Sequence, residues 1–119
     1  MAFNQELADR VRELLKSERN VVEKKMFGGL AFIVNDKMCV NVSEDNLMCR
    51  FNPALQKELS TKEGYQPTIM RGRELEGYCY VNQAHIKTDD ALTYWVNLCL
   101  DFNKISKSSK TGKSNPNNN

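Results

Sequence analysis

Four cysteines and one histidine are the residues of this chain that could carry nucleophilic or metal chemistry. Cys39, Cys49, Cys79 and Cys99 never form a C-x-x-C pair, and His85 is the only histidine. A zinc site needs ligands that are close in sequence or joined by histidines, and a cysteine nucleophile needs a base within hydrogen-bonding distance. The spacing meets neither condition. We therefore expect no catalytic residue, no metal site and no cofactor, and we interpret the chain as a protein that is not an enzyme.

Gly28 and Gly29 could cradle a phosphate, because glycines let a backbone approach a ligand closely. Phosphate-binding glycines stand between a parallel strand and a helix. This pair instead leads from one apolar strand pattern into another, and no G-x-G-x-x-G or Walker pattern occurs. We expect a bulge, a bend or the close approach of a second backbone.

Arg71 and Arg73 stand two residues apart, so an extended segment would present both guanidinium groups on one side. Arginine suits bidentate recognition of carboxylate or phosphate. Two interpretations stay open: local ion pairs with Glu74 or Glu76, or contact with a partner. Nucleic acid is one such partner, reached with the help of the lysine-bearing tail. The chain has a net charge of +2, and four of its lysines follow residue 103. Without those lysines the domain is slightly acidic, so it lacks the clustered basic surface that is typical of nucleic-acid binding.

The length of 119 residues suits one domain with one hydrophobic core. The N-terminus enters a charged helical pattern at once, without a secretory signal. No apolar run approaches the ~20 residues that a membrane span needs. Widely spaced cysteines fit reduced thiols, so we expect a cytoplasmic protein without membrane contact.

Hydrophobic periodicity and turn signals predict the elements that must position these residues. A helix is predicted over 5–18 with Asn4 as its cap, and Asn35-Asp36 forms a two-residue turn within a meander of strands. The remaining predictions are strands over 21–27, 30–34, 37–42, 47–51, 67–70 and 78–81, a short helix over 53–59 capped by Asn52, and a closing helix over 89–102 capped by Thr88. This order predicts a two-layer α+β fold with an antiparallel five- to six-stranded sheet and helices on one face. Residues 1–103 form the domain, and residues 104–119 are expected to be a disordered tail.

Alternation along the meander sorts its side chains into two faces. The face predicted to be packed contains Ala31, Ile33, Met38, Val40, Val42, Leu47, Cys49 and Phe51. The other face is mixed and contains Leu30, Phe32, Val34, Lys37, Cys39, Asn41, Met48 and Arg50. Cys39 and Cys79 can face outward in this scheme. If no helix covers the mixed face, its apolar side chains form an exposed patch of the kind that marks an interface.

The pattern K-x-M-F-G-G-hydrophobic-x-F, which starts at Lys24, resembles the TfoX (Sxy) N-terminal domain family. Arg71-Gly72-Arg73 and the aromatic closing helix around Trp95 add to the resemblance. The resemblance implies a bacterial, cytosolic α+β domain with a regulatory role, in competence or transcription, and no established catalysis. Longer members carry a second, helical C-terminal domain, where this chain has its lysine- and asparagine-rich tail; we therefore expect a stand-alone N-terminal module.

We expect a regulatory domain that acts by association with a protein partner or a second copy through the open sheet face. A small nucleic-acid-binding domain is the first alternative, and an uncharacterised enzyme is the second. The candidate interaction surface consists of Lys25, Phe27, Gly28, Gly29, Leu30, Phe32, Met48, Arg50, Arg71 and Arg73.

Overall fold

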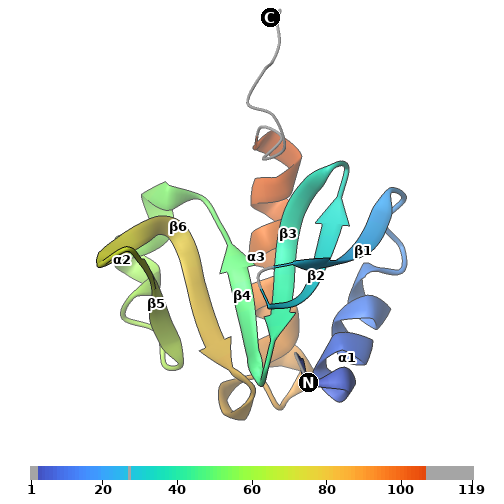
Figure 1. Cartoon of the computed structure of the whole chain (residues 1–119), viewed down its shortest axis with the longest axis horizontal. Helices are drawn as coiled ribbons and strands as arrows, with labels where there is room; N and C mark the ends of the chain where they lie inside the picture. Colours follow the sequence, from blue (N-terminus) through green and yellow to red (C-terminus); the bar gives the residue numbers. More distant parts are fainter. Residues whose placement is uncertain (1–2, 27, 107–119) are drawn as a thin grey trace, which may run out of the picture.

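Six antiparallel strands form one sheet in the computed structural model, which describes residues 3–26 and 28–106. Their order is β1-β2-β3-β4-β6-β5, so β1 and β5 are the two edges. The sheet curls, with the β5–β6 hairpin at one end and the β1–β2 hairpin at the other (Figure 1). The strands are β1 (Val21–Met26), β2 (Gly29–Val34), β3 (Lys37–Ser43), β4 (Asn46–Arg50), β5 (Tyr65–Met70) and β6 (Arg73–Asn82).

Tight turns join the hairpins of this sheet. Asn35 and Asp36, between β2 and β3, have φ angles of 54° and 66°. Both angles lie in the left-handed region that a type I′ turn requires and that Asn and Asp tolerate. The predicted two-residue turn is therefore confirmed. Arg71 and Gly72 adopt the same kind of turn between β5 and β6, with φ angles of 56° and 79°.

Two long helices, α1 (Gln5–Leu15) and α3 (Asp89–Ile105), lie on one face of the sheet (Figure 1). The three predicted caps are confirmed: the side chains of Asn4, Asn52 and Thr88 each accept a hydrogen bond from a backbone N–H of the first turn. The predicted helix over 5–18 ends earlier, at Leu15. Between β4 and β5 lie a 3₁₀ turn, η1 (Pro53–Leu55), and a single turn, α2 (Gln56–Leu59), and η2 (Gln83–His85) precedes α3.

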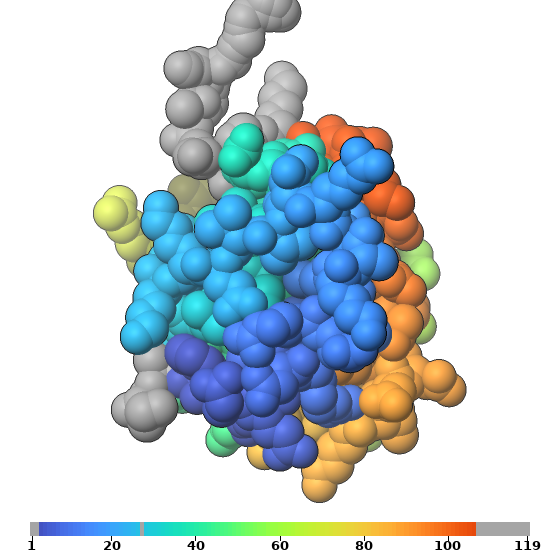
Figure 2. All heavy atoms as spheres, turned by 90° about the vertical axis from the view of Figure 1, so that its right-hand side faces the viewer, coloured from blue at the N-terminus to red at the C-terminus, as the bar shows by residue number. Residues whose placement is uncertain are grey.

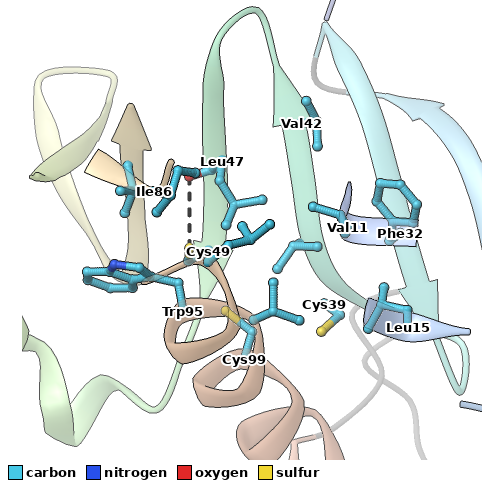
Figure 3. Close-up of a cluster of buried hydrophobic side chains, with 14 of the residues drawn as sticks. Val11, Leu15, Phe32, Cys39, Val42, Leu47, Cys49, Ile86, Trp95 and Cys99 are labelled. Carbon is cyan, nitrogen blue, oxygen red and sulfur yellow. Dashed lines mark hydrogen bonds between the residues drawn. The ribbon is translucent and has the colours of Figure 1, made fainter. Parts of the chain in front are cut away.

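The core fills the space between the helices and the sheet (Figure 3). Val11 and Leu15 of α1 approach Phe32 of β2, while Trp95 and Cys99 of α3 approach β4. The largest side chains that are almost fully buried include Phe32, Phe51, Leu15, Leu47, Leu59, Ile86 and Leu92. We call the sheet face that contacts these helices the packed face, and the other side the open face.

A shift in strand register corrects the predicted sorting of side chains. Phe32 pairs with Val40, but Ile33 pairs with Met38, so Cys39 is an extra residue in β3. Such a bulge changes which face the following residues occupy. Leu30, Phe32 and Val34 consequently join Val40 and Val42 in the core cluster, while Ala31, Ile33 and Met38 lie on the open face. The predicted sorting is correct from Val40 to Cys49 and for Phe51, and it is wrong for β2 and the start of β3. It is also wrong for Arg50, whose guanidinium contacts Phe102 of α3.

The fold prediction is confirmed: the structure is a two-layer α+β domain with an antiparallel sheet of six strands. The helix α3 continues through Ile105, so the first residues of the predicted tail are helical. The rest of that tail, residues 107–119, lies outside the described residues. Within residues 3–26 and 28–106, no helix combines the length and the apolar character needed to cross a membrane.

Candidate functional site

The structure separates the predicted interaction residues instead of gathering them on one surface. Lys25 and Gly28 are exposed near the β1–β2 turn, whereas Leu30 and Phe32 are 7% and 0% exposed and belong to the core. The exposure predicted for Leu30 and Phe32 is therefore wrong, because the bulge at Cys39 turns them toward the helices. Phe27 lies outside the described residues.

Gly28 and Gly29 lie where β2 and β3 approach each other closely. Gly28 has a φ of +72°, which favours glycine, and a Cβ on Gly29 would lie 2.2 Å from the carbonyl oxygen of Val42. The same Cβ would lie 2.6 Å from Oδ1 of Asn41, whose amide donates to the carbonyl of Met26 at 3.0 Å. The prediction of a close backbone approach at this pair is confirmed. Gly29 is buried and cannot contact a partner.

Met48, predicted to be exposed on the mixed face, and Arg50, predicted at the rim of that face, also differ from their predicted places. Met48 lies between Asn41 and Tyr80 on the open face and is only 3% exposed. The guanidinium of Arg50 lies 5.4 Å from the ring centre of Phe102 in α3. Arg50 therefore contributes a cation–π contact to the packing of the closing helix.

The remaining predicted residues, Arg71 and Arg73, lie at the tip of the β5–β6 hairpin, the left-hand end of the sheet in Figure 1. Met70 pairs with Arg73, and Ile69 pairs with Glu74. Because Arg71 occupies the turn, the two guanidinium groups do not emerge side by side from an extended segment, so that prediction is wrong. We define the hairpin tip as Ile69, Met70, Arg71, Gly72 and Arg73.

Two large apolar side chains are exposed at the hairpin tip: Ile69 is 58% and Met70 is 48% exposed. Among residues 3–26 and 28–106, the other exposed large apolar residues are Val22, Tyr94 and Ile105, which lie on other elements. The hairpin tip is thus the place in the described chain where two such residues adjoin. Sequence analysis missed them, although their position next to an Arg-Gly turn, on a strand interrupted by Pro67, is typical of an exposed edge hairpin.

The charges of the hairpin tip are available to a partner. Glu74 accepts hydrogen bonds from Nε2 of Gln56 at 2.7 Å and from the hydroxyl of Tyr65 at 3.2 Å. Burial and this contact with Glu74 raise the pKa of Tyr65 to about 12, so the hydroxyl keeps its proton at neutral pH. No ion pair joins Arg71 or Arg73 to another residue in the described part of the chain. The interpretation of local ion pairs with Glu74 or Glu76 is therefore not supported.

The cysteines are placed for packing. All four are free and buried, including Cys39 and Cys79, for which the sequence left an outward orientation open. Burial raises the pKa of the Cys39 and Cys49 thiols, which disfavours the reactive thiolate. His85 lies away from them, with its Nδ1 3.8 Å from a carboxylate oxygen of Glu63. Within the described residues, no cluster of three or more histidine, cysteine or acidic side chains is arranged to hold a metal ion.

Comparison with protein families extends the identification beyond the K-x-M-F-G-G pattern. The model of the TfoX N-terminal domain matches residues 13–103, which is more than half of the chain. The chain belongs to the TfoX N-terminal domain family. The matched region runs from the last turn of α1 to the last turns of α3, so it includes the whole sheet of this TfoX N-terminal domain. Neither the curated proteins nor the solved structures contain a match to the chain.

Proposed function

We propose that this TfoX N-terminal domain is a non-enzymatic regulatory module, acting in competence or transcription, that binds a partner protein through the hairpin tip. The observation that carries the proposal is the adjacency of exposed Ile69 and Met70 to two guanidinium groups without ion pairs in the described chain. The partner surface has the complementary chemistry: an apolar pocket bordered by carboxylates. We place the association in the cytoplasm, where free thiols such as those of the four cysteines persist.

The exposed side chains of Ile69 and Met70 support a protein partner, since exposed apolar surface can mark an interface. Because they are successive residues of β5, they present one apolar side chain on each face of the hairpin. Arginine is enriched at protein interfaces, and methionine adapts to irregular apolar pockets. The hairpin tip is ordered by strand pairing, because Ile69 pairs with Glu74 and Met70 pairs with Arg73 on either side of the turn. Little conformational entropy would therefore be lost on binding compared with an unstructured loop.

Nucleic acid is the rival partner, because arginine also pairs with phosphate and apolar side chains can contact bases. Only two arginines lie at the hairpin tip, and the carboxylate of Glu74, which accepts hydrogen bonds from Gln56 and Tyr65, places a negative charge next to them. Nucleic-acid binding depends on several phosphate contacts and weakens steeply with salt. The hairpin tip alone offers few such contacts, which favours the protein partner.

Affinity capture from native lysate with two tip variants tests the proposal. Ile69→Ser/Met70→Ser removes the apolar surface and keeps both charges, while Arg71→Gln/Arg73→Gln does the reverse. We expect each double variant to lose the same captured protein, with recovery unchanged after nuclease treatment. Matched controls are Ile105→Ser, an exposed apolar residue elsewhere, and Arg19→Gln, an exposed arginine elsewhere.

The outcomes separate the two partner classes. Recovery that disappears with nuclease, falls steeply with salt and depends only on the arginines would favour the nucleic-acid-binding alternative. Equal recovery by the wild type and both tip variants would refute a role for the hairpin tip in either kind of association.

A further inference from the structure

The two edges of the sheet differ in how well they are protected against a further strand. The β5 edge contains Pro67, which lacks an N–H, and its pairing with β6 shifts register between Pro67 and Ile69. Both features hinder the addition of a strand. The β1 edge pairs with β2 in one unbroken register from Val21 to Met26 and contains no proline. β1 is therefore the edge that can accept another strand.

Two hydrogen bonds define which backbone groups of β1 face outward. The N–H of Asn35 donates to the carbonyl of Asn20 at 2.9 Å, and the Asn41 amide donates to the carbonyl of Met26 at 3.0 Å. Both carbonyls thus point toward the sheet. Because backbone groups alternate in direction along an antiparallel strand, Val22 and Lys24 also direct theirs to β2. The N–H and C=O groups of Val21, Glu23 and Lys25 consequently point away from the sheet.

The β1 edge is also exposed as a surface. Figure 2 shows β1, in light blue, on the outside of the molecule above the dark blue α1. Val22 is 56% exposed, and Glu23, Lys24 and Lys25 are exposed as well. Glu23 keeps its place through two hydrogen bonds from Arg12, one of them at 2.8 Å from Nη2. Arg12 therefore holds the carboxylate beside the free edge.

Symmetry limits how two β1 edges can pair. Two antiparallel copies are related by a two-fold axis, and directly opposed residues must lie on the same sheet face. The outward N–H and C=O groups of Val21, Glu23 and Lys25 must form the hydrogen bonds between the two copies. Two registers near the middle of β1 allow this: one places Glu23 opposite Glu23 of the other copy, and the second places Lys24 opposite Lys24 of the other copy. The first register opposes two Glu23 carboxylates. The second opposes Glu23 to Lys25 of the other copy on both sides of the axis, and Val22 to Met26.

We propose that this domain forms a homodimer by antiparallel pairing of β1 with β1 of a second copy, in the register centred on Lys24. The pairing joins two sheets into one and places two Glu23–Lys25 ion pairs on the α1 side. The exposed Val22 gains an apolar neighbour on the open face. Lys24 faces Lys24 of the other copy, which weakens the dimer and disfavours prolonged edge-to-edge aggregation. This inference is independent of the hairpin tip, which lies at the other end of the sheet.

Charge reversal tests the register, with sedimentation velocity across a concentration series as the measurement. Lys25→Glu and Glu23→Lys each replace two ion pairs by two like-charge pairs, so we expect each to weaken dimerisation about tenfold or more. The double variant Glu23→Lys/Lys25→Glu restores opposite charges across the axis, and we expect it to dimerise better than either single variant. Arg71→Glu at the opposite end of the sheet is the control and should dimerise like the wild type.

Amide hydrogen exchange supplies a second readout that requires no substitution. In the monomer, the outward N–H groups of Glu23 and Lys25 exchange fast, while those of Val22 and Lys24 are protected by β2. Raising the protein concentration should protect Glu23 and Lys25 selectively. A wild type that sediments as a monomer at every concentration, a double variant no better than its single variants, or unchanged exchange at Glu23 and Lys25 would each overturn the proposal.

Discussion

Gly29 gives the sharpest stability prediction, because the space for a side chain at this position is occupied by backbone. An alanine Cβ would lie 2.2 Å from the Val42 carbonyl oxygen and 2.9 Å from the Cα of Ser43, where ordinary contact begins near 3.4 Å. The strands must therefore separate by about 1 Å, in a region where β2 pairs with both neighbours. Overpacking of this kind costs about 1–3 kcal/mol or more.

A second loss adds to that cost, since Oδ1 of Asn41 lies 2.6 Å from the same Cβ position. Moving Asn41 weakens its buried hydrogen bond to Met26, which is worth about 0.5–1.5 kcal/mol. We therefore expect Gly29→Ala to lower the free energy of unfolding by about 3–4 kcal/mol, measured by urea denaturation. For a domain of this size, that corresponds to a fall of about 10–20 °C in Tm.

Gly28→Ala is the matched control. Its φ of +72° is unfavourable for alanine, but no atom lies within 4 Å of the added Cβ. The expected cost is only the left-handed backbone, about 1–2 kcal/mol. If Gly29→Ala proved no more destabilising than Gly28→Ala, the close approach of β2 to β3 would be refuted.

Three further predictions concern the core, an ion pair and the thiols. Phe32→Ala should lower the free energy of unfolding, measured in urea, by about 3–5 kcal/mol, because its ring is fully buried. A loss below about 1 kcal/mol would contradict the burial of Phe32. Arg12 lowers the pKa of Glu23 below its usual 4.5, so the pair stabilises the fold above that pH and the contribution is lost as the pH falls through the lowered value. In the Glu23→Gln variant, the free energy of unfolding should therefore fall less steeply as the pH is lowered, by no more than about 1 kcal/mol for so exposed a pair. An unchanged dependence on pH would contradict a stabilising Arg12–Glu23 pair. A thiol reagent should label the four buried cysteines slowly in the native protein and rapidly in denaturant, whereas fast native labelling would contradict their burial.

Local signals predicted much of the fold. The caps Asn4, Asn52 and Thr88 and the turn at Asn35-Asp36 depend on interactions within a few residues, which a sequence pattern contains. The order of helices and strands followed from periodicity and from connections too short for parallel crossovers. These features are independent of the details of core packing.

The face of Phe32 could not be predicted from the hairpin alone. A two-residue turn predicts regular pairing along β2 and β3, but the extra residue at Cys39 shifts the phase by one. The residues of β2 that the bulge turns inward pack in one core cluster with residues of α1 and α3, which are distant in sequence. The predicted interaction surface was affected directly, because Leu30 and Phe32 at its centre belong to the core. Of its described residues, Lys25, Gly28, Arg71 and Arg73 are exposed, at separate places in the fold.

The location of the hairpin tip as an interaction surface is the central functional proposal, and site-specific photocrosslinking tests it most directly. A photoreactive amino acid at position 70 is compared with the same group at position 105, which is exposed at the end of α3. In native lysate, the proposal predicts a discrete protein crosslink from position 70 that position 105 does not give, and that Arg71→Gln/Arg73→Gln reduces. Equal crosslinking from both positions, or crosslinks from position 70 to nucleic acid alone, would contradict it.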